Sequence, residues 1–145
     1  MELRQVFLNL VGNAIQAMPG GGDLRLSVRD VYDWQLKRHG ISVSIVDTGN
    51  GVNPQDSRKL FEPFFSTKST KGTGLGLWIS KGIVQKYEGR ISFRSFRCEN
   101  RCTTCFRVFL PSSGTVNLIG TPASELTSAD VEISSNGYGA AMQHA

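Results

Sequence analysis

The chain has 145 residues and a formal net charge of +4, which is long enough for one domain around one core. Its lysines and arginines are scattered, without a block of about six like charges, so nothing in the composition favours a nucleic-acid partner. No apolar run approaches the ~18 residues of a membrane-spanning helix, and the first residues do not form a signal peptide. We therefore expect no direct membrane contact and a cytoplasmic location.

Residues 3–18 predict the first helix, because apolar side chains recur there at helical spacing. A polar stripe lies beside the apolar one and consists of Gln5, Asn9, Asn13 and Gln16. Pro19 and the three glycines after it end the helix.

Two strands are predicted next, at residues 24–28 and 41–46, because apolar and polar residues alternate in both. Asp47 follows the second strand and shares the parity of its apolar residues, so it should face the helix-covered side of the sheet. A carboxylate in that position needs a hydrogen-bond donor, which a ligand can supply.

Residues 52–71 show no periodicity, and so long a loop in a compact domain is usually a lid or disordered. A second helix is predicted at residues 74–88, with Gly89 as its stop. The side chains predicted to face the core are Leu75, Trp78, Ile79, Ile83 and Tyr87.

A closing pair of strands follows, with Ile91 and Phe93 in the first strand and residues 106–110 in the second. Pro111 ends the fold. We assign residues 1–111 to one domain. Residues 112–145 are rich in Ser, Gly, Ala and Thr, and we assign them to a disordered tail or linker.

The two asparagines of the first helix suggest a metal site. Asn9 and Asn13 are one turn apart and share a helix face. An Asn carbonyl oxygen suits Mg²⁺, which also keeps waters and substrate phosphates among its ligands. The alternative interpretation is that both are solvated positions on the helix surface.

The segment Asp47-Thr48-Gly49-Asn50-Gly51 combines a carboxylate with two glycines. Asp47 can accept the exocyclic amine of adenine, and Gly49 and Gly51 allow the backbone to approach a flat base. Taken alone, the segment also fits an ordinary Asp-x-Gly turn after a strand.

Residues 72–77, GTGLGL, place three alternate glycines at the start of the second predicted helix. Glycine lowers helix stability, so the pattern needs another reason. Free amides and the positive end of the dipole at a helix N-terminus bind phosphate. The spacing excludes a dinucleotide fingerprint and a Walker loop. With Asp47 and the two asparagines, these glycines indicate a nucleotide site.

Four segments in this order resemble the sequence boxes of two-component sensor histidine kinases. The resemblance covers about residues 3–111 and extends to the wider GHKL superfamily, which includes gyrase-type ATPases and heat-shock chaperones. The four boxes are residues 9–18 (N box), 47–51 (G1 box), 61–68 (F box) and 72–77 (G2 box). In addition, residues 106–111 resemble the family's final strand.

The resemblance implies an α/β two-layer sandwich, in which a mixed β-sheet has helices packed on one face. It implies an ATP site where Asn13 ligates Mg²⁺, Asp47 holds adenine and Lys68 reaches the terminal phosphate from the lid. Catalytic roles fall to Asn9 and Lys68. The implied nucleotide contacts also include Asn9, Gly49, Gly51, Phe65, Gly72, Thr73, Gly74, Leu75, Gly76, Leu77 and Thr104.

By the same resemblance, the chain transfers the ATP γ-phosphate to a histidine on a separate dimerisation domain, and through it to a response regulator. Gyrase-like relatives carry a glutamate where this chain has Asn9, and an amide cannot take a proton from water. The resemblance therefore implies phosphate transfer rather than hydrolysis.

From the same resemblance, we expect this chain to be without the family's leading strand and acceptor domain. Its only histidines, His39 and His144, do not lie in an acceptor-like helix. We therefore expect a fragment or one part of a split kinase. The alternatives are a nucleotide-binding regulatory or degenerate fragment without transfer activity, and a serine kinase of the anti-sigma type.

Cys98, Cys102 and Cys105 have the C-x3-C-x2-C spacing of radical-SAM enzymes, but those are much longer barrels with an early motif. Three cysteines do not make a disulfide framework, and a zinc site would lack its fourth ligand. Three free thiols in a hairpin are the expected arrangement.

Overall fold

The computed structural model describes residues 2–66, 73–98, 101–112 and 129–134. Helices alternate with pairs of strands along the chain. The elements are α1 (Glu2–Ala17), β1 (Asp23–Asp33), β2 (Arg38–Asp47), α2 (Gly76–Lys86), β3 (Arg90–Cys98), β4 (Arg101–Pro111) and β5 (Ala129–Ser134).

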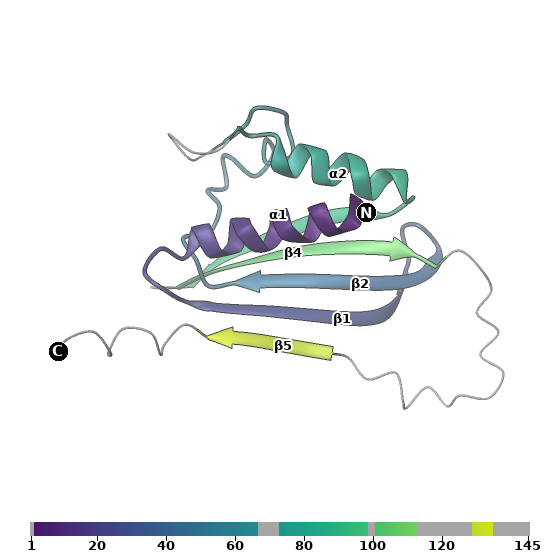
Figure 1. Cartoon of the computed structure of the whole chain (residues 1–145), viewed down its shortest axis with the longest axis horizontal. Coiled ribbons are helices and arrows are strands. Elements are labelled where there is room, and N and C mark those ends of the chain that lie inside the picture. Colours follow the sequence, from purple (N-terminus) through teal and green to yellow (C-terminus); the bar gives the residue numbers. More distant parts are fainter. Residues whose placement is uncertain (1, 67–72, 99–100, 113–128, 135–145) are drawn as a thin grey trace.

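The strands form one sheet in the order β3-β4-β2-β1-β5, and α1 and α2 lie together on one of its faces (Figure 1). The predicted two-layer α/β sandwich is confirmed. The sheet is more uniform than predicted, because all the pairings among the described strands are antiparallel. No helix in the described part of the chain is long and apolar enough to cross a membrane.

The core lies between α1 and the helix-covered face of the sheet. Val6, Leu10 and Ala14 are buried at four-residue spacing along α1, which brings them onto one stripe of the helix. They pack with side chains of alternate parity on the central strands and with apolar residues of α2. These partners include Ile45, Val108 and Val84.

The orientation of α2 differs from the prediction. Its buried residues are Ser80 and Val84, whereas Trp78 is 48% exposed and Tyr87 is 43% exposed. The prediction that Trp78 and Tyr87 face the core is therefore wrong. The small side chain of Ser80 faces Asn9 of α1 through a hydrogen bond of 3.0 Å, so a close helix crossing decides which side of α2 is buried.

The C-terminus of α2 also differs from the prediction. Glu88, not Gly89, has the left-handed conformation, with a φ of 55°. The Gly89 N–H donates to the carbonyl of Val84 at 3.0 Å and the Glu88 N–H to that of Gln85 at 2.9 Å, which is a Schellman-type end. A Cβ on Gly89 would lie 2.3 Å from the Phe109 carbonyl oxygen, so this glycine permits a close approach to β4.

Strand β5 lies in the segment that was assigned to a tail. It pairs with the edge of β1, from Asp23 opposite Ser134 to Val28 opposite Ala129. The prediction of no regular structure is wrong for residues 129–134. Their alternation of apolar and polar residues, ADVEIS, is short and is surrounded by Ser- and Gly-rich sequence, which hid it. The rest of the predicted tail beyond residue 112 lies outside the described residues.

Candidate functional site

A cavity of about 340 Å³ lies between α1, the end of β2, the loop that precedes α2 and the start of α2. This volume is within the range of about 300–1,000 Å³ that is usual for small-ligand sites. The structure brings most of the predicted site residues together around it. Those that line it are Asn9, Asn13, Asp47, Gly51, Phe65, Thr73, Gly74, Gly76, Leu77 and Thr104.

Two described residues of the predicted set do not line this cavity. A Cβ on Gly49 would lie 2.5 Å from the Ala17 carbonyl oxygen, so Gly49 lets the loop pack against the end of α1. Leu75 is the residue before the first turn of α2. Lys68 and Gly72 lie outside the described residues.

Asp47 is the buried acid of the site. It is only 2% exposed, at the end of β2, with the helix-facing parity that the sequence predicted. One carboxylate oxygen accepts a hydrogen bond of 3.0 Å from the Gly49 N–H. Burial raises the pKa of Asp47, and the Gly49 bond opposes this rise. The carboxyl group is therefore placed to accept a further donor from a ligand in the cavity.

A short chain of hydroxyl groups supports the loop after Asp47. The Val52 N–H donates to Ser95 Oγ at 3.1 Å, and that hydroxyl lies 3.5 Å from Thr104 Oγ1. Thr104 is buried directly opposite Asp47 in the sheet. These contacts tie the loop to β3 and β4 and make Thr104 part of the cavity wall.

Asn9 connects the two helices. Its Nδ2 donates to Ser80 Oγ at 3.0 Å. A Cβ on Gly76 would come within 2.3 Å of its Oδ1, so the absence of a side chain at Gly76 makes room for the Asn9 amide. Asn13 lines the same cavity one turn further along α1, as its spacing predicted.

The start of α2 borders the cavity through Gly76 and Leu77, so the positive end of its dipole is near the space a ligand would fill. Gly74 has a φ of +67°, and a Cβ there would lie 2.5 Å from the carbonyl carbon of Phe64. The glycine segment therefore passes directly against the loop that precedes it.

The family model for histidine kinase-, DNA gyrase B-, and HSP90-like ATPases matches residues 1–114. The chain belongs to this family.

Its relatives and structural neighbours in this ATPase family include sensor kinases. The chain is 36% identical to sporulation kinase E of Bacillus subtilis (strain 168) over 110 residues, which is 76% of this chain but 14% of that protein. It therefore spans about one seventh of the length of that relative.

Two solved structures show the same fold. The mycobacterial sensor histidine kinase MprB superposes with a TM-score of 0.66 at 29% identity, over 76% of this chain and 72% of that one. Full-length ShkA in complex with AMPPNP superposes with a TM-score of 0.56 at 29% identity, over 78% of this chain and 22% of that one.

The cavity also includes residues that were not predicted as site residues. Gln16 could have been found, because it belongs to the polar stripe of Asn9 and Asn13. Three of the others lie within segments that resemble the family, at Ala17, Ser66 and Phe106, but their residue types do not single them out, and tertiary packing brings the rest to the cavity. The rest are Val52 and Leu60.

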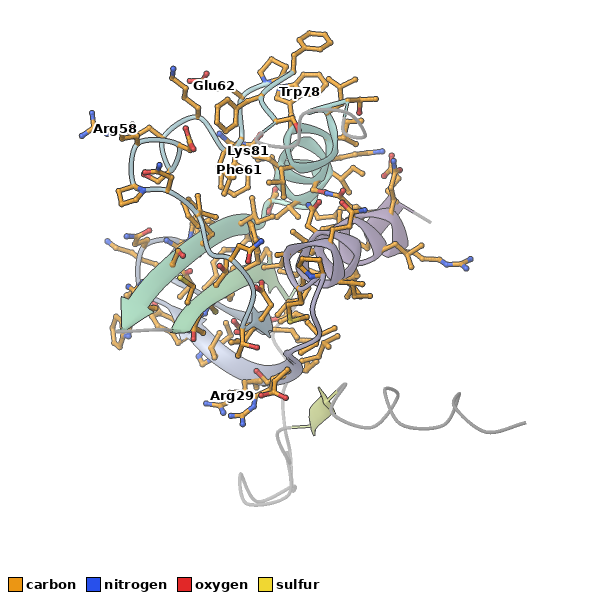
Figure 2. The ribbon with its side chains drawn as sticks, turned by 90° about the vertical axis from the view of Figure 1, so that its left-hand side faces the viewer. Arg29, Arg58, Phe61, Glu62, Trp78 and Lys81 are labelled. Carbon is orange, nitrogen blue, oxygen red and sulfur yellow. The ribbon has the colours of Figure 1, made fainter. Side chains whose placement is uncertain are left out.

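A second hollow, of about 570 Å³, lies between α2 and the loop residues 61–63. Phe61 is packed edge-on against Phe93, with 6.1 Å between ring centroids. The Lys81 ammonium lies over the Phe61 ring, 5.9 Å from its centroid. Trp78 and Glu62 also line this hollow (Figure 2). Phe61 thus anchors the loop, while Trp78 stays accessible.

The two cysteines whose side chains the structure describes do not lie together. Cys102 and Cys105 are three residues apart in β4, so they face opposite sides of the sheet. Neither forms a disulfide. Within the described part of the chain, no group of three His, Cys, Asp or Glu residues could hold a metal ion. The side chain of Cys98 is outside that part.

Proposed function

We propose that this chain is the ATP-binding catalytic domain of a sensor histidine kinase. It transfers the γ-phosphate of ATP to a histidine on a separate dimerisation domain, from which a response regulator receives it. The observation that carries the proposal is the cavity itself. It joins Asp47, the asparagines of α1 and the glycine-rich start of α2, which come from three distant parts of the sequence.

The residues at the cavity fit ATP and Mg²⁺. The buried carboxylate of Asp47 would accept the adenine amine, with Thr104 and Gly51 beside it. Amide groups and the dipole at the start of α2 would hold phosphates. The Asn13 side-chain oxygen is a suitable Mg²⁺ ligand, and the ion would supply charge neutralisation to the phosphates. Lys68 and Gly72 are also proposed to belong to the site, although they are not among the described residues.

The phosphate acceptor is proposed to come from another domain. His39, in β2, packs its ring against Tyr32 with 4.9 Å between centroids, and it does not line the cavity. The hollow beside the site, with Trp78 accessible at its edge, would let an acceptor domain approach the phosphate end.

A labelling experiment tests the proposal. The chain is incubated with [γ-³²P]ATP and Mg²⁺, alone and with a separately purified dimerisation domain of a sensor histidine kinase. We expect no acid-labile label on the chain alone and label on the added domain. An acceptor domain with its histidine changed to glutamine is the control.

Acid-labile label on His39 or His144 of the chain alone would contradict the proposal. ATP binding without transfer to acceptor domains from several relatives would favour a nucleotide-binding regulatory fragment instead.

A further inference from the structure

The face of the sheet without helices carries a concentration of arginine. A hollow of about 720 Å³ lies on it, and five of the ten arginines of the sequence line it, whereas none of the described side chains that line it is a lysine or a glutamate. Figure 2 shows one of them, Arg29, on the side of the sheet opposite the helices. The five are Arg25, Arg29, Arg90, Arg94 and Arg107.

The strand register arranges these arginines as an array. Arg107 of β4 is central, with Ser44 of β2 and Ser92 of β3 opposite it on either side. A cross-strand row is a set of residues that lie opposite one another on neighbouring strands. On each side of the Arg107 row, the next row on the same face spans four strands, so its two ends are roughly 14 Å apart. One row ends in Arg25 and Arg94, and the other in Arg29 and Arg90.

The described side chains of the array carry a net positive charge, while the register of β5 sets Glu132 opposite Arg25 and Asp130 opposite Ser27 at its edge. Asp33 is the one acidic residue among the described residues that line the hollow, and it pairs with Arg90 at 2.6 Å. The described part of the chain provides no carboxylate partner for Arg29, Arg94 or Arg107. Burial raises the pKa of the Cys105 thiol, and Arg107 and Arg94 oppose this rise from positions beside it near the middle of the sheet.

The composition of this face fits a protein partner. Arginine binds carboxylates with two parallel hydrogen bonds, which lysine cannot do. Arginine, tryptophan and tyrosine dominate the binding energy of protein interfaces, whereas lysine and glutamate are depleted there. At one end of the hollow, Trp34 is 82% exposed and rests edge-on against Tyr32, with centroids 4.7 Å apart.

The same composition fits nucleic acid less well. Stacking of successive bases needs aromatic rings along the path of the strand. Here the exposed aromatic residues, Trp34 and Phe96, lie towards the margins, and serines and arginines occupy the centre.

We propose that the helix-free face of the sheet binds an extended acidic segment of a partner polypeptide. Alternate residues of an extended chain are about 6.6–6.8 Å apart on one face, which is also the step between successive cross-strand rows of the array. A segment with acidic residues at alternate positions would therefore meet successive rows. This surface lies on the opposite side of the sheet from the nucleotide cavity, so the two sites are tested separately.

The test uses the full chain and a fluorescein-labelled decapeptide of alternating Glu and Ser in 50 mM NaCl. The variant R29Q/R107Q removes two charges from the array, and R4Q/R58Q removes two exposed arginines elsewhere. Fluorescence anisotropy should show binding that R29Q/R107Q weakens about fivefold or more and R4Q/R58Q leaves nearly unchanged, and 0.5 M NaCl should abolish it. ATP affinity should be equal in all three proteins.

A footprint locates the peptide. In a C98S/C102S background Cys105 is the remaining thiol, and bound peptide should slow its alkylation at pH 8.5, whereas a Gln-Ser peptide should not. Equal weakening by both double variants, no slowing at Cys105 or no binding up to millimolar peptide would overturn the proposal. Tighter binding of a decathymidylate or of phosphatidylserine vesicles, with the same dependence on Arg29 and Arg107, would assign the surface to those partners and also overturn it.

Discussion

Asp47 places ligand binding and stability in opposition. A carboxylate that is 2% exposed, with one hydrogen bond from the described residues, favours its neutral form, and burial accordingly raises its pKa. The same group is the best acceptor in the cavity for an amine of the ligand. Sequence parity predicted its direction, because strand side chains alternate, but its degree of burial depends on residues of α1 and β4 that are distant in sequence.

Asp47→Asn should separate these two effects. The variant should lose a charge-assisted bond worth ~1.5–3 kcal/mol, so ATP affinity should fall about tenfold or more by calorimetry. The nucleotide-free variant should not be less stable than wild type at pH 7, since Asn can still accept the Gly49 N–H. Unchanged ATP affinity would remove Asp47 from the site.

The sign of the pH effect follows from the raised pKa of Asp47. The folded protein holds this proton more tightly than the unfolded chain, whose Asp pKa is about 3.9. Wild-type stability should therefore fall, relative to Asp47→Asn, as pH rises from about 4 through the raised folded pKa. Urea unfolding of both proteins between pH 4 and 7.5 measures this difference, and a constant difference across that range would contradict it.

Asp33 should behave in the opposite way. It accepts the N–H groups of Leu36 and Gln35 at 3.0 and 2.9 Å and pairs with Arg90, and these donors lower its pKa, with the Leu36 bond first. Asp33→Ala should lower the free energy of unfolding by about 1–3 kcal/mol at pH 7. The loss should shrink as pH falls below about 4 towards the lowered folded pKa. Chemical unfolding of wild type and Asp33→Ala at pH 7 and pH 3 measures this difference. An equal loss of unfolding free energy at both pH values would count against this role of Asp33.

The crossing of α1 and α2 was the element least accessible to sequence reasoning. Periodicity found both helices, and α1 to within one residue at each end, because apolar residues at helical spacing define its buried stripe. In α2 the large residue Trp78 is exposed and the small residue Ser80 is buried. The reason is the Asn9–Ser80 hydrogen bond, which joins positions 71 residues apart and leaves no pattern within either helix.

Two glycines of α2 provide a matched pair of substitutions. Gly82→Ala meets nothing within 4 Å and should stabilise the protein by up to about 1 kcal/mol through helix propensity. Gly76→Ala gains less helix propensity, because Gly76 is the first residue of α2, and its Cβ would lie 2.3 Å from Asn9 Oδ1 and displace the amide that binds Ser80. Thermal unfolding should show opposite shifts in Tm. A rise in both would mean that the helix crossing relaxes easily.

At the scale of the whole molecule, the sheet separates two chemically different faces. The helix-covered face ends in the ligand cavity, and the other carries the arginine array. The alternation of the four longer strands predicted a two-faced sheet. It did not predict β5, because edge pairing depends on an open partner strand more than on the short sequence that fills it.

The cavity favours phosphate transfer over hydrolysis. Hydrolysis needs a base that deprotonates or positions water. Among the described residues that line the cavity, Asp47 is the one carboxylate and there is no histidine, and Asp47 is proposed to hold the base. The Asn9 amide cannot act as a base, and its Nδ2 is already bound to Ser80. ATP should therefore persist until an imidazole from an acceptor domain reaches its terminal phosphate.

We expect negligible ATPase activity from the wild-type chain in a phosphate-release assay. Asn9→Glu should not create an ATPase, because the longer acid loses the Ser80 bond and meets the backbone at Gly76, so it should lower Tm instead. Gly12→Ala, on the same helix with nothing within 4 Å of its new Cβ, is the matched control and should leave both properties close to wild type or slightly raise Tm. Rapid Mg²⁺-dependent turnover by the wild type would move this chain from the kinases to the ATPases of its family. Turnover by Asn9→Glu alone would show that the helix crossing accepts an acid and that only the base was missing.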